Sequence, residues 1–163
     1  MAPRALFDIL PRGVLPILRE IGRVVLRRPV AGILAIARRA DGQVLLIRRS
    51  DTGTWAPPGG TLEWDEPARV TLARELQEEA GATLIAAGRL LGVYTAPQRD
   101  ARMHAVTIVV EAQVESHLSG PANLLEVTDA RFFAAHELPA PLAYTYGEML
   151  ERALGEPSST YWE

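Results

Sequence analysis

The stretch on which the fold prediction rests is GGTLEWDEPARVTLARELQEEAGA, residues 59–82. It predicts a helix over residues 67–80, because Pro67 suits a first helical turn and Gly81 suits the position just past a helix end. Glu75, Glu78 and Glu79 lie three and four residues apart on this helix. Like charges at these spacings repel one another. The pattern therefore indicates that a positive charge from outside the chain compensates them.

The surroundings of the helix indicate what that charge is. Ala73, Leu76 and Ala80 form the predicted inward stripe, so the three glutamates converge on a neighbouring face. Residues 57–60, Pro-Pro-Gly-Gly, precede the helix, and backbone without a Cβ can approach a ligand closely and turn a carbonyl inward. Carboxylate and carbonyl oxygens suit Mg²⁺ or Mn²⁺. A solvated acidic helix is the alternative, but the glycine-rich loop favours a divalent cation that arrives with a polyanionic substrate.

Composition predicts an ordinary globular domain. The chain has 163 residues, of which 48% are hydrophobic and 23% charged, enough for one sizeable core. It has no cysteine, which excludes disulfides, thiol nucleophiles and iron–sulfur ligation and fits a reducing compartment. All 17 basic residues are arginine and the net charge is −3, so no nucleic-acid partner is expected.

Hydropathy gives no sign of a membrane span or a secretory signal. The longest clean apolar run, residues 30–37, is far shorter than the roughly 20 residues that cross a bilayer. Asp8, Pro11 and Arg12 interrupt the early apolar residues, so no secretory signal is predicted. We therefore expect a cytoplasmic protein.

The first 29 residues form a basic N-terminal arm that contains six arginines and two acidic residues. Residues 16–28 have apolar side chains at helical spacing and charged ones opposite, which predicts an amphipathic helix ended by Pro29. Its apolar face would pack on the domain or on a second subunit, with a membrane-surface helix as the alternative. The predicted organisation is an arm over residues 1–29 and one folded domain over residues 30–163.

The remaining elements predict an α/β fold. Residues 30–39 and 43–49 are predicted strands around a turn at Asp41-Gly42, since Asp-Gly favours hairpins. Residues 103–114 and 130–134 are further predicted strands, and residues 142–154 a closing helix. These elements do not alternate as in a doubly wound sheet, so we expect a mixed sheet covered by helices on both faces.

The acidic helix and its loop resemble the signature of the Nudix hydrolases. Gly60, Glu66 and the run at residues 74–81 match every fixed position of that signature, while Ala82 stands where a larger aliphatic residue is usual. The resemblance covers roughly residues 30–154 and implies a Nudix-type α/β/α sandwich with a mixed β-sheet. It also implies Mg²⁺-dependent hydrolysis, with Mn²⁺ as a possible substitute, of a nucleoside diphosphate linked to another moiety, cleaved at the diphosphate.

The resemblance implies a role for each matching residue. Glu75 would bind a further metal or help to deprotonate the attacking water. Arg74 would hold Glu66 and a ligating carboxylate in place, which orients the metal ligands from behind. The groups implied as metal ligands are the carbonyl of Gly59 and the carboxylates of Glu75, Glu78 and Glu79.

Family members often supply one more catalytic carboxylate from outside the signature. Glu126 occupies the matching place in NLLEVTDARFF, residues 123–133. Glu111 and Glu115 are alternatives, as is Glu63 beside the signature. A plain loop role for Glu126 also stays open.

The segment from Gly92 to His104 is the predicted substrate loop. Pro97 lies fifteen positions after Ala82, and Arg99-Asp100-Ala101-Arg102 follows. This is similar to the Nudix subgroup that acts on ADP-ribose and related sugar nucleotides, whose members are commonly homodimers.

Four residues are predicted substrate contacts. Arg99 and Arg102 would clamp a phosphate bidentately, and Trp55 and Tyr94 would stack on a base or ribose. The alternatives are a salt-bridged surface loop for the arginines and apolar anchors for the aromatic residues.

The sequence thus predicts an enzyme whose substrate is ADP-ribose or a nucleoside diphosphate sugar. One alternative is a pyrophosphohydrolase that removes pyrophosphate from oxidised nucleoside triphosphates. An alternative of another class is a ligand-sensing Nudix module without catalysis, against which the intact glutamate set argues.

Overall fold

The computed structural model describes residue 22, residues 28–155 and residues 159–163. The predicted arm and its amphipathic helix lie outside these residues, apart from Gly22 and Arg28. Within the described residues, none of the helices is both long and apolar enough to cross a membrane.

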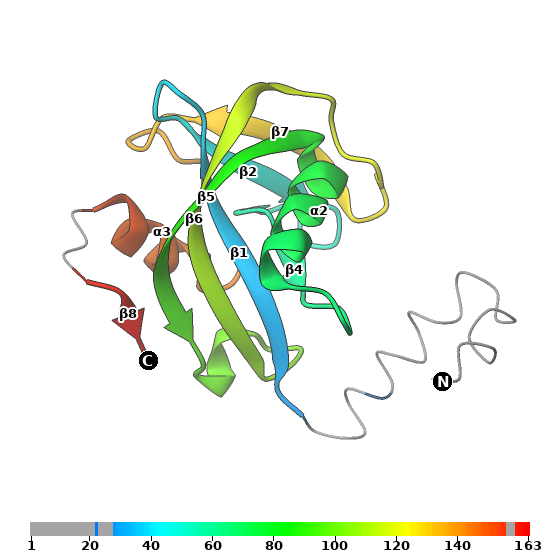
Figure 1. The fold of residues 1–163 in the computed structure, drawn as a ribbon, viewed down its shortest axis with the longest axis vertical. Helices are drawn as coiled ribbons and strands as arrows, with labels where there is room; N and C mark the ends of the chain where they lie inside the picture. The colour runs from blue at the N-terminus through cyan, green and yellow to red at the C-terminus, as the bar shows by residue number, and fades with distance from the viewer. Residues whose placement is uncertain (1–21, 23–27, 156–158) are drawn as a thin grey trace, which may run out of the picture.

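The described chain folds around one mixed sheet (Figure 1). The strand order is β3-β2-β1-β6-β5-β8, with β4 paired to β1 and β7 paired to β2. The first and sixth strands are parallel and most other pairs antiparallel, so the predicted mixed sheet is confirmed. The bounds are β1 Val30–Arg38, β2 Val44–Arg49, β3 Trp55–Ala56, β4 Gly59–Thr61, α2 Ala68–Ala80, β5 Ala82–Tyr94, η1 Pro97–Arg99, β6 Ala105–Leu118, β7 Val127–Phe133, α3 Tyr146–Leu154 and β8 Tyr161–Trp162.

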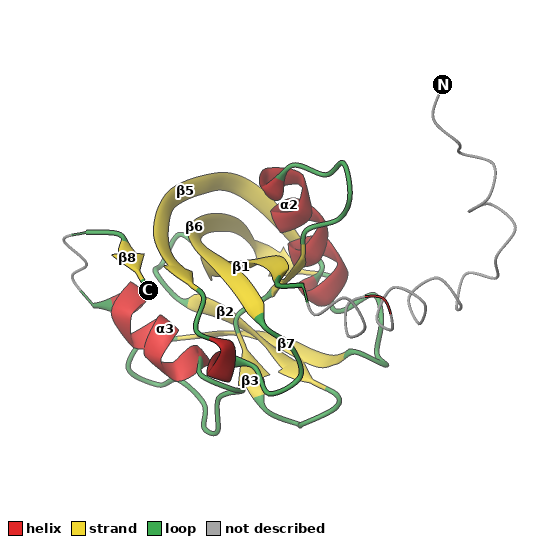
Figure 2. Cartoon of the chain, turned by 90° about the horizontal axis from the view of Figure 1, so that it is seen from below, coloured by secondary structure: helices red, strands yellow, loops and turns green. Residues whose placement is uncertain are grey.

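Strand alternation explains why β1 is apolar along its whole buried length. Successive side chains of a strand point to opposite faces, and both faces of β1 are covered. Ile33 and Ala35 pack into the cluster with α2, whereas Leu34 and Ile36 pack into the cluster with α3. Figure 2 shows the two helices on opposite sides of the sheet, which confirms the α/β/α arrangement.

Helix α2 confirms the central prediction. It spans Ala68–Ala80, and Gly81 after it has φ 62°, the left-handed conformation that glycine adopts most readily. Leu72, Leu76 and Ala80 are buried against the sheet. The predicted inward stripe is therefore corrected at one position: Ala73 is only partly buried, and the larger apolar side chain of Leu72 faces the core.

Two further elements differ from prediction. Strand β5 was not predicted, because its side chains do not alternate cleanly, and its pairing with β6 contains several register shifts. Helix α3 begins at Tyr146 instead of residue 142. Before it, Leu142 bridges to Trp55, and the Ala143 N–H donates to the Trp55 carbonyl at 2.7 Å, which keeps this segment extended.

The predicted strands 103–114 and 130–134 are found, shifted, as β6 and β7.

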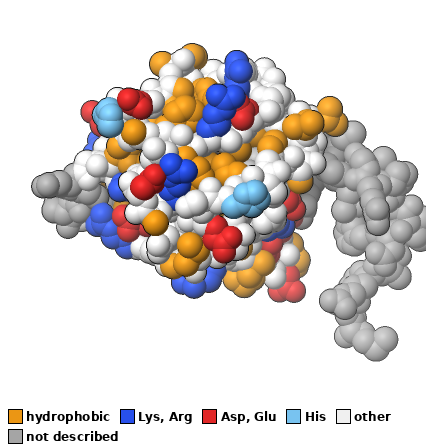
Figure 3. Space-filling model, turned by 90° about the horizontal axis from the view of Figure 1, so that it is seen from above, with side chains coloured by type: hydrophobic (Ala, Val, Ile, Leu, Met, Phe, Trp, Pro, Cys, Tyr) orange, Lys and Arg blue, Asp and Glu red, His pale blue; other side chains and the backbone are white. Residues whose placement is uncertain are grey.

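On the face shown in Figure 3, basic and acidic side chains are interspersed among apolar ones.

Candidate active site

Glu79 lies on the side of α2 that faces β4. The Gly59 N–H donates to its carboxylate at 2.8 Å. The side chain is partly buried, and desolvation raises the pKa of Glu79 to about 8, against the opposing effect of that hydrogen bond. A carboxylate in this position is costly to ionise unless a cation accompanies it.

Glu75 lies one turn earlier and packs against the backbone of Gly60. A Cβ on Gly60 would lie 2.1 Å from Glu75 Oε1, so this close approach requires glycine. Arg74 Nη1 donates to the same oxygen at 2.8 Å. Burial raises the pKa of Glu75, although the Arg74 charge opposes this. The Gly59 N–H thus binds one carboxylate of α2, and the missing side chain of Gly60 leaves room for another.

Arg74 connects the loop before α2 to the carboxylates on it. Its Nε and Nη2 donate to the two oxygens of Glu66, both at 3.1 Å, while the Thr71 hydroxyl donates to Glu66 at 2.9 Å. Its Nη1 also donates to Glu78, at 3.3 Å. The Arg74 side chain is 30% exposed. This geometry fixes Arg74 as an orienting group at the edge of the acidic cluster.

Four carboxylates line one cavity of about 280 Å³ beside α2. Three come from the helix, and Glu126 comes from the loop before β7. That loop is held in place because the Ser50 N–H donates to the Glu126 carbonyl at 2.9 Å, and the Ala122 N–H donates to the Glu78 carbonyl at 2.8 Å. The lining residues are Glu75, Glu78, Glu79, Ala122, Asn123, Glu126 and Val127.

The other candidate carboxylates lie elsewhere. Glu111 lines a separate cavity on β6 and pairs with Arg89 at 3.4 Å. Glu115 is exposed on β6, and Glu63 lies in the loop before α2. Among the rivals considered from sequence, Glu126 is the one that the fold brings to the acidic cavity.

The donor set fits a hard divalent cation. All of its charged groups are carboxylates, with Arg74 as the one cation bonded to them in the described chain. As placed, no three acidic or imidazole side chains of the described residues form a ready ligand cluster. Arg74 and the Gly59 N–H hold these carboxylates instead. Mg²⁺ usually keeps several waters and takes one or two carboxylates, so a cavity of this size suits it.

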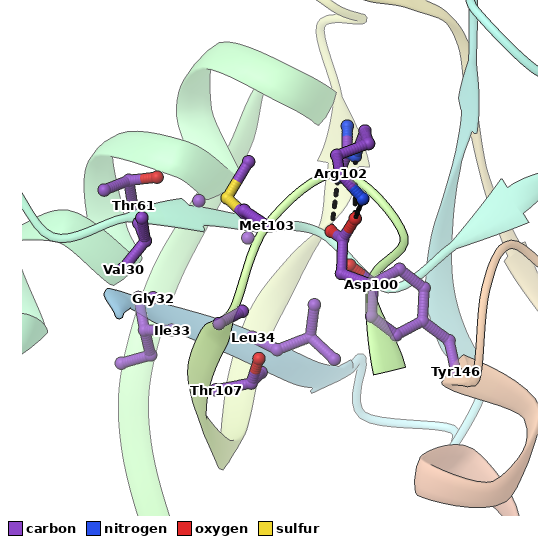
Figure 4. Close-up of a pocket in the computed structure, with 13 residues that line it drawn as sticks. Val30, Gly32, Ile33, Leu34, Thr61, Asp100, Arg102, Met103, Thr107 and Tyr146 are labelled. Atoms are coloured by element: carbon purple, nitrogen blue, oxygen red, sulfur yellow. Dashed lines mark hydrogen bonds and ion pairs between the residues drawn. The ribbon is translucent and has the colours of Figure 1, made fainter. Parts of the chain in front are cut away.

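A second, smaller cavity of about 120 Å³ is lined in part by Gly59 and Gly60, whose backbone lies against Glu79 and Glu75 of the acidic cavity. Asp100, Arg102 and Tyr146 line it (Figure 4). Arg102 donates to both Asp100 oxygens, at 3.0 and 2.7 Å. Burial acts to raise the pKa of Asp100, but the hydrogen bonds from Arg102 and its charge together lower it. One of the predicted substrate arginines therefore lines the same cavity as Gly59, whose carbonyl is one of the predicted metal ligands.

The other predicted substrate contacts lie away from both cavities. Arg99 is 13% exposed and bonded to Glu163 and Glu148. Tyr94 is 3% exposed in the core, and Trp55 packs edge-on against Phe133 at 4.9 Å between ring centres. All three are described residues, and none lines either cavity.

Sequence reasoning missed two residues near the site, Arg49 and Tyr144. The Arg49 charge is one of the effects that oppose the raised pKa of Glu79, while the Arg49 side chain itself donates to Asp51 at 2.9 and 2.7 Å. Its guanidinium lies 5.5 Å from the centre of the Tyr144 ring, and that of Arg102 lies 4.6 Å from it. Side chains alternate along a strand, so Arg49 is expected on the same face as Leu45 and Ile47, which is the face that α2 covers. Tyr144 has no comparable signal, because the segment before α3 has no periodicity.

Comparisons with known proteins agree with this geometry. A family model described as NUDIX domain matches residues 26–153. An ADP-ribose pyrophosphatase from Methanocaldococcus jannaschii is 33% identical over 115 residues, which are 68% of this chain and 65% of that protein. A MutT-like protein from Streptomyces ambofaciens is 48% identical over 65 residues, 40% of each chain. The matches thus span less than two thirds of the length of both relatives.

A solved structure extends the similarity to nearly a whole chain. The crystal structure of a MutT NUDIX hydrolase from Burkholderia pseudomallei is 32% identical, with a TM-score of 0.64. The match covers 77% of the present chain and 98% of the Burkholderia chain.

Proposed function

The chain belongs to the Nudix family of hydrolases, and from this premise we propose that it is a Mg²⁺-dependent enzyme that cleaves the diphosphate of a nucleoside diphosphate linked to another moiety. The preferred substrate is ADP-ribose or a nucleoside diphosphate sugar. The observation that carries the proposal is a pair of cavities, one lined by four carboxylates and one lined by Arg102 together with Gly59 and Gly60.

The acidic cavity supplies the groups for hydrolysis. Glu78 and Glu79 would hold the metal, with Glu75 and Glu126 as further acidic groups in the same cavity. A divalent cation there would neutralise diphosphate oxygens and acidify a bound water. Arg74 keeps Glu75 and Glu78 in place. Little covalent chemistry is then required of the chain itself, since phosphoryl transfer depends mainly on positioning and charge.

The smaller cavity supplies a contact for the rest of the substrate. Arg102 would bind the diphosphate or the terminal ribose, with its fork oriented by Asp100. Tyr144 lies under the Arg102 guanidinium, so an aromatic face accompanies the cationic group. The name of the Methanocaldococcus jannaschii relative, ADP-ribose pyrophosphatase, supports this substrate class.

The experiment is a substrate panel with product analysis. Purified enzyme is given ADP-ribose, nucleoside diphosphate sugars and an oxidised deoxyguanosine triphosphate, each with Mg²⁺, with Mn²⁺ and with a chelator. We expect the highest kcat/KM for a diphosphate substrate, with a nucleoside monophosphate and a sugar phosphate as products. Preference for the triphosphate with release of pyrophosphate would favour the nucleotide-cleaning alternative. Binding without turnover of any substrate would favour the sensing module.

A further inference from the structure

The side chain of Glu163 collects an unusual number of donors for a residue far from the acidic cavity. Arg99 donates to both of its oxygens, from Nε at 2.9 and 3.0 Å and from Nη2 at 2.6 Å. The N–H groups of Thr95 and Ala96 donate to it at 2.8 and 2.6 Å. Bidentate, charge-assisted bonds of this kind are the strong hydrogen bonds of proteins. They join the C-terminal strand to the segment after β5.

The strand that carries Glu163 is itself fixed to the fold. Strand β8 pairs in parallel with β5 at Gly92 and Val93, and the Glu163 N–H donates to the Val93 carbonyl at 3.1 Å. The Tyr161 ring packs 4.9 Å from the Tyr94 ring. Glu163 therefore offers its carboxylate from a defined position.

Residues 95–104, here named the pocket loop, have Arg99 near their middle and the pocket-lining Asp100 and Arg102 next to it. The ends of the loop are closed, since the His104 ring bonds the Thr95 carbonyl at 2.9 Å and the Val30 N–H donates to the His104 carbonyl at 2.9 Å. Arg99 connects the middle of the loop to β8 and, through Glu148 at 2.9 Å, to α3.

We propose that Arg99 and Glu163 are positioning residues for the substrate cavity: their ion pair sets where the pocket loop holds Asp100 and Arg102. Arg99 acts through Arg102 and does not itself touch the substrate. The 13% and 21% exposure of the two side chains supports this, because their charged groups are mostly occupied by each other and by the chain. The kinetic part of the inference rests on the proposed function, whereas the structural part does not.

The kinetic test is a mutant cycle. We expect Arg99→Ala and Glu163→Gln to raise KM for ADP-ribose about tenfold and to leave kcat within about threefold, which is the pattern of lost uniform binding. Arg99→Lys keeps the charge but not the bidentate guanidinium, so its KM should lie between those of these two variants and that of the parent. In an Arg102→Ala background, Arg99→Ala should raise KM by less than about twofold, because residues that act as one unit are not additive.

Arg152→Ala is the matched control. Arg152 donates to Glu148 at 3.1 Å and lies 4.3 Å from the Tyr161 ring centre, so the change removes a guanidinium from the same α3–β8 region. No contact of its side chain with the pocket loop is found in the described residues. We expect KM to stay within about twofold of the parent.

Amide hydrogen exchange tests the positioning without reference to activity. In Glu163→Gln, amides of residues 99–103 should exchange at least about tenfold faster, while those of α2 keep their protection. Unchanged exchange in the loop, unchanged KM in both single variants, or a full Arg99→Ala effect in the Arg102→Ala background would each overturn the proposal. A parent enzyme inactive on all diphosphates would instead overturn the proposed function, and the exchange comparison would still decide the positioning.

Discussion

At the scale of single residues, the candidate site combines two partly buried carboxylates, Glu75 and Glu79, with two exposed ones, Glu78 and Glu126. Glu79 shows the effect of burial most clearly, because its pKa is raised to about 8 by desolvation and by its neighbours Glu75 and Glu126. The Gly59 N–H opposes part of that cost. When such a carboxylate is ionised without a neighbouring cation, it destabilises the fold. When a cation binds beside it, the same carboxylate can serve as a ligand.

Replacing a metal-binding carboxylate should therefore separate activity from stability. We expect Glu78→Gln and Glu79→Gln each to lower kcat about 10²-fold or more, as loss of a metal ligand weakens the site. The melting temperature should stay within about 2 °C of the parent, because Glu79, with its pKa raised to about 8, is largely uncharged at neutral pH, and the exposed ion pair of Glu78 with Arg74 contributes little to stability. Parallel kinetics and thermal melts check this, with exposed Glu115→Gln as control. Near-full turnover in either variant would contradict the metal assignment.

Glu163 gives a prediction for acid stability. Its bonds with Arg99 and the neighbouring N–H groups lower the pKa of Glu163 from 4.5 to about 2. Because the pKa is depressed in the folded state, the stabilisation is present above about pH 4.5 and is lost as the pH falls towards 2. We expect the parent to melt above Glu163→Gln at neutral pH and the difference to vanish near pH 2. A difference that is constant with pH would contradict the ion pair.

At the scale of elements, β4 controls how α2 meets the sheet. A Cβ added at either of its two glycines would clash, but with different atoms. At Gly59 the Cβ would lie 2.2 Å from the Ile33 carbonyl oxygen and 2.8 Å from Leu34 Cα, which are backbone atoms of β1. At Gly60 the three nearest atoms are those of the Glu75 carboxylate, the end of a side chain.

The matched pair Gly59→Ala and Gly60→Ala tests this difference. We expect Gly59→Ala to lower the melting temperature by roughly 5 °C or more, because β1 and β4 must separate. Gly60→Ala should keep the melting temperature within about 2 °C and lower kcat about tenfold or more, because only the Glu75 carboxylate moves. Circular dichroism melts and steady-state kinetics measure the two effects. Equal destabilisation in both variants would show that the strand contact is not what limits Gly59.

At the scale of the whole molecule, association of two chains stays a prediction. Residues 16–28, which lie mostly outside the described residues, have apolar side chains at helical spacing, which predicts a helix with an apolar face. We expect the full chain to form a homodimer at micromolar concentration. Placing glutamate at Ile21 and Val25 on that face should yield monomers, as sedimentation equilibrium would show. A monomeric mass for the parent would count against the arm as an interface.

The sequence by itself determined the parts of this protein that depend on local spacing. The positions of Glu66, Arg74 and Gly81 identified the Nudix signature, and α2 and the first two strands follow from periodicity. The clustered glutamates and the absence of cysteine also pointed to a hard cation, because the preference of a metal for its ligands depends on residue type and can be read from sequence.

Only the tertiary structure decided which distant residues meet. It placed Glu126 in the acidic cavity, brought Arg49 and Tyr144 towards the site, and paired β5 with β6. It also divided the roles of two neighbouring arginines, because Arg102 lines the smaller cavity while Arg99 is held by Glu163, 64 residues further along the chain. Contacts over such separations depend on strand order and register, which no local pattern encodes.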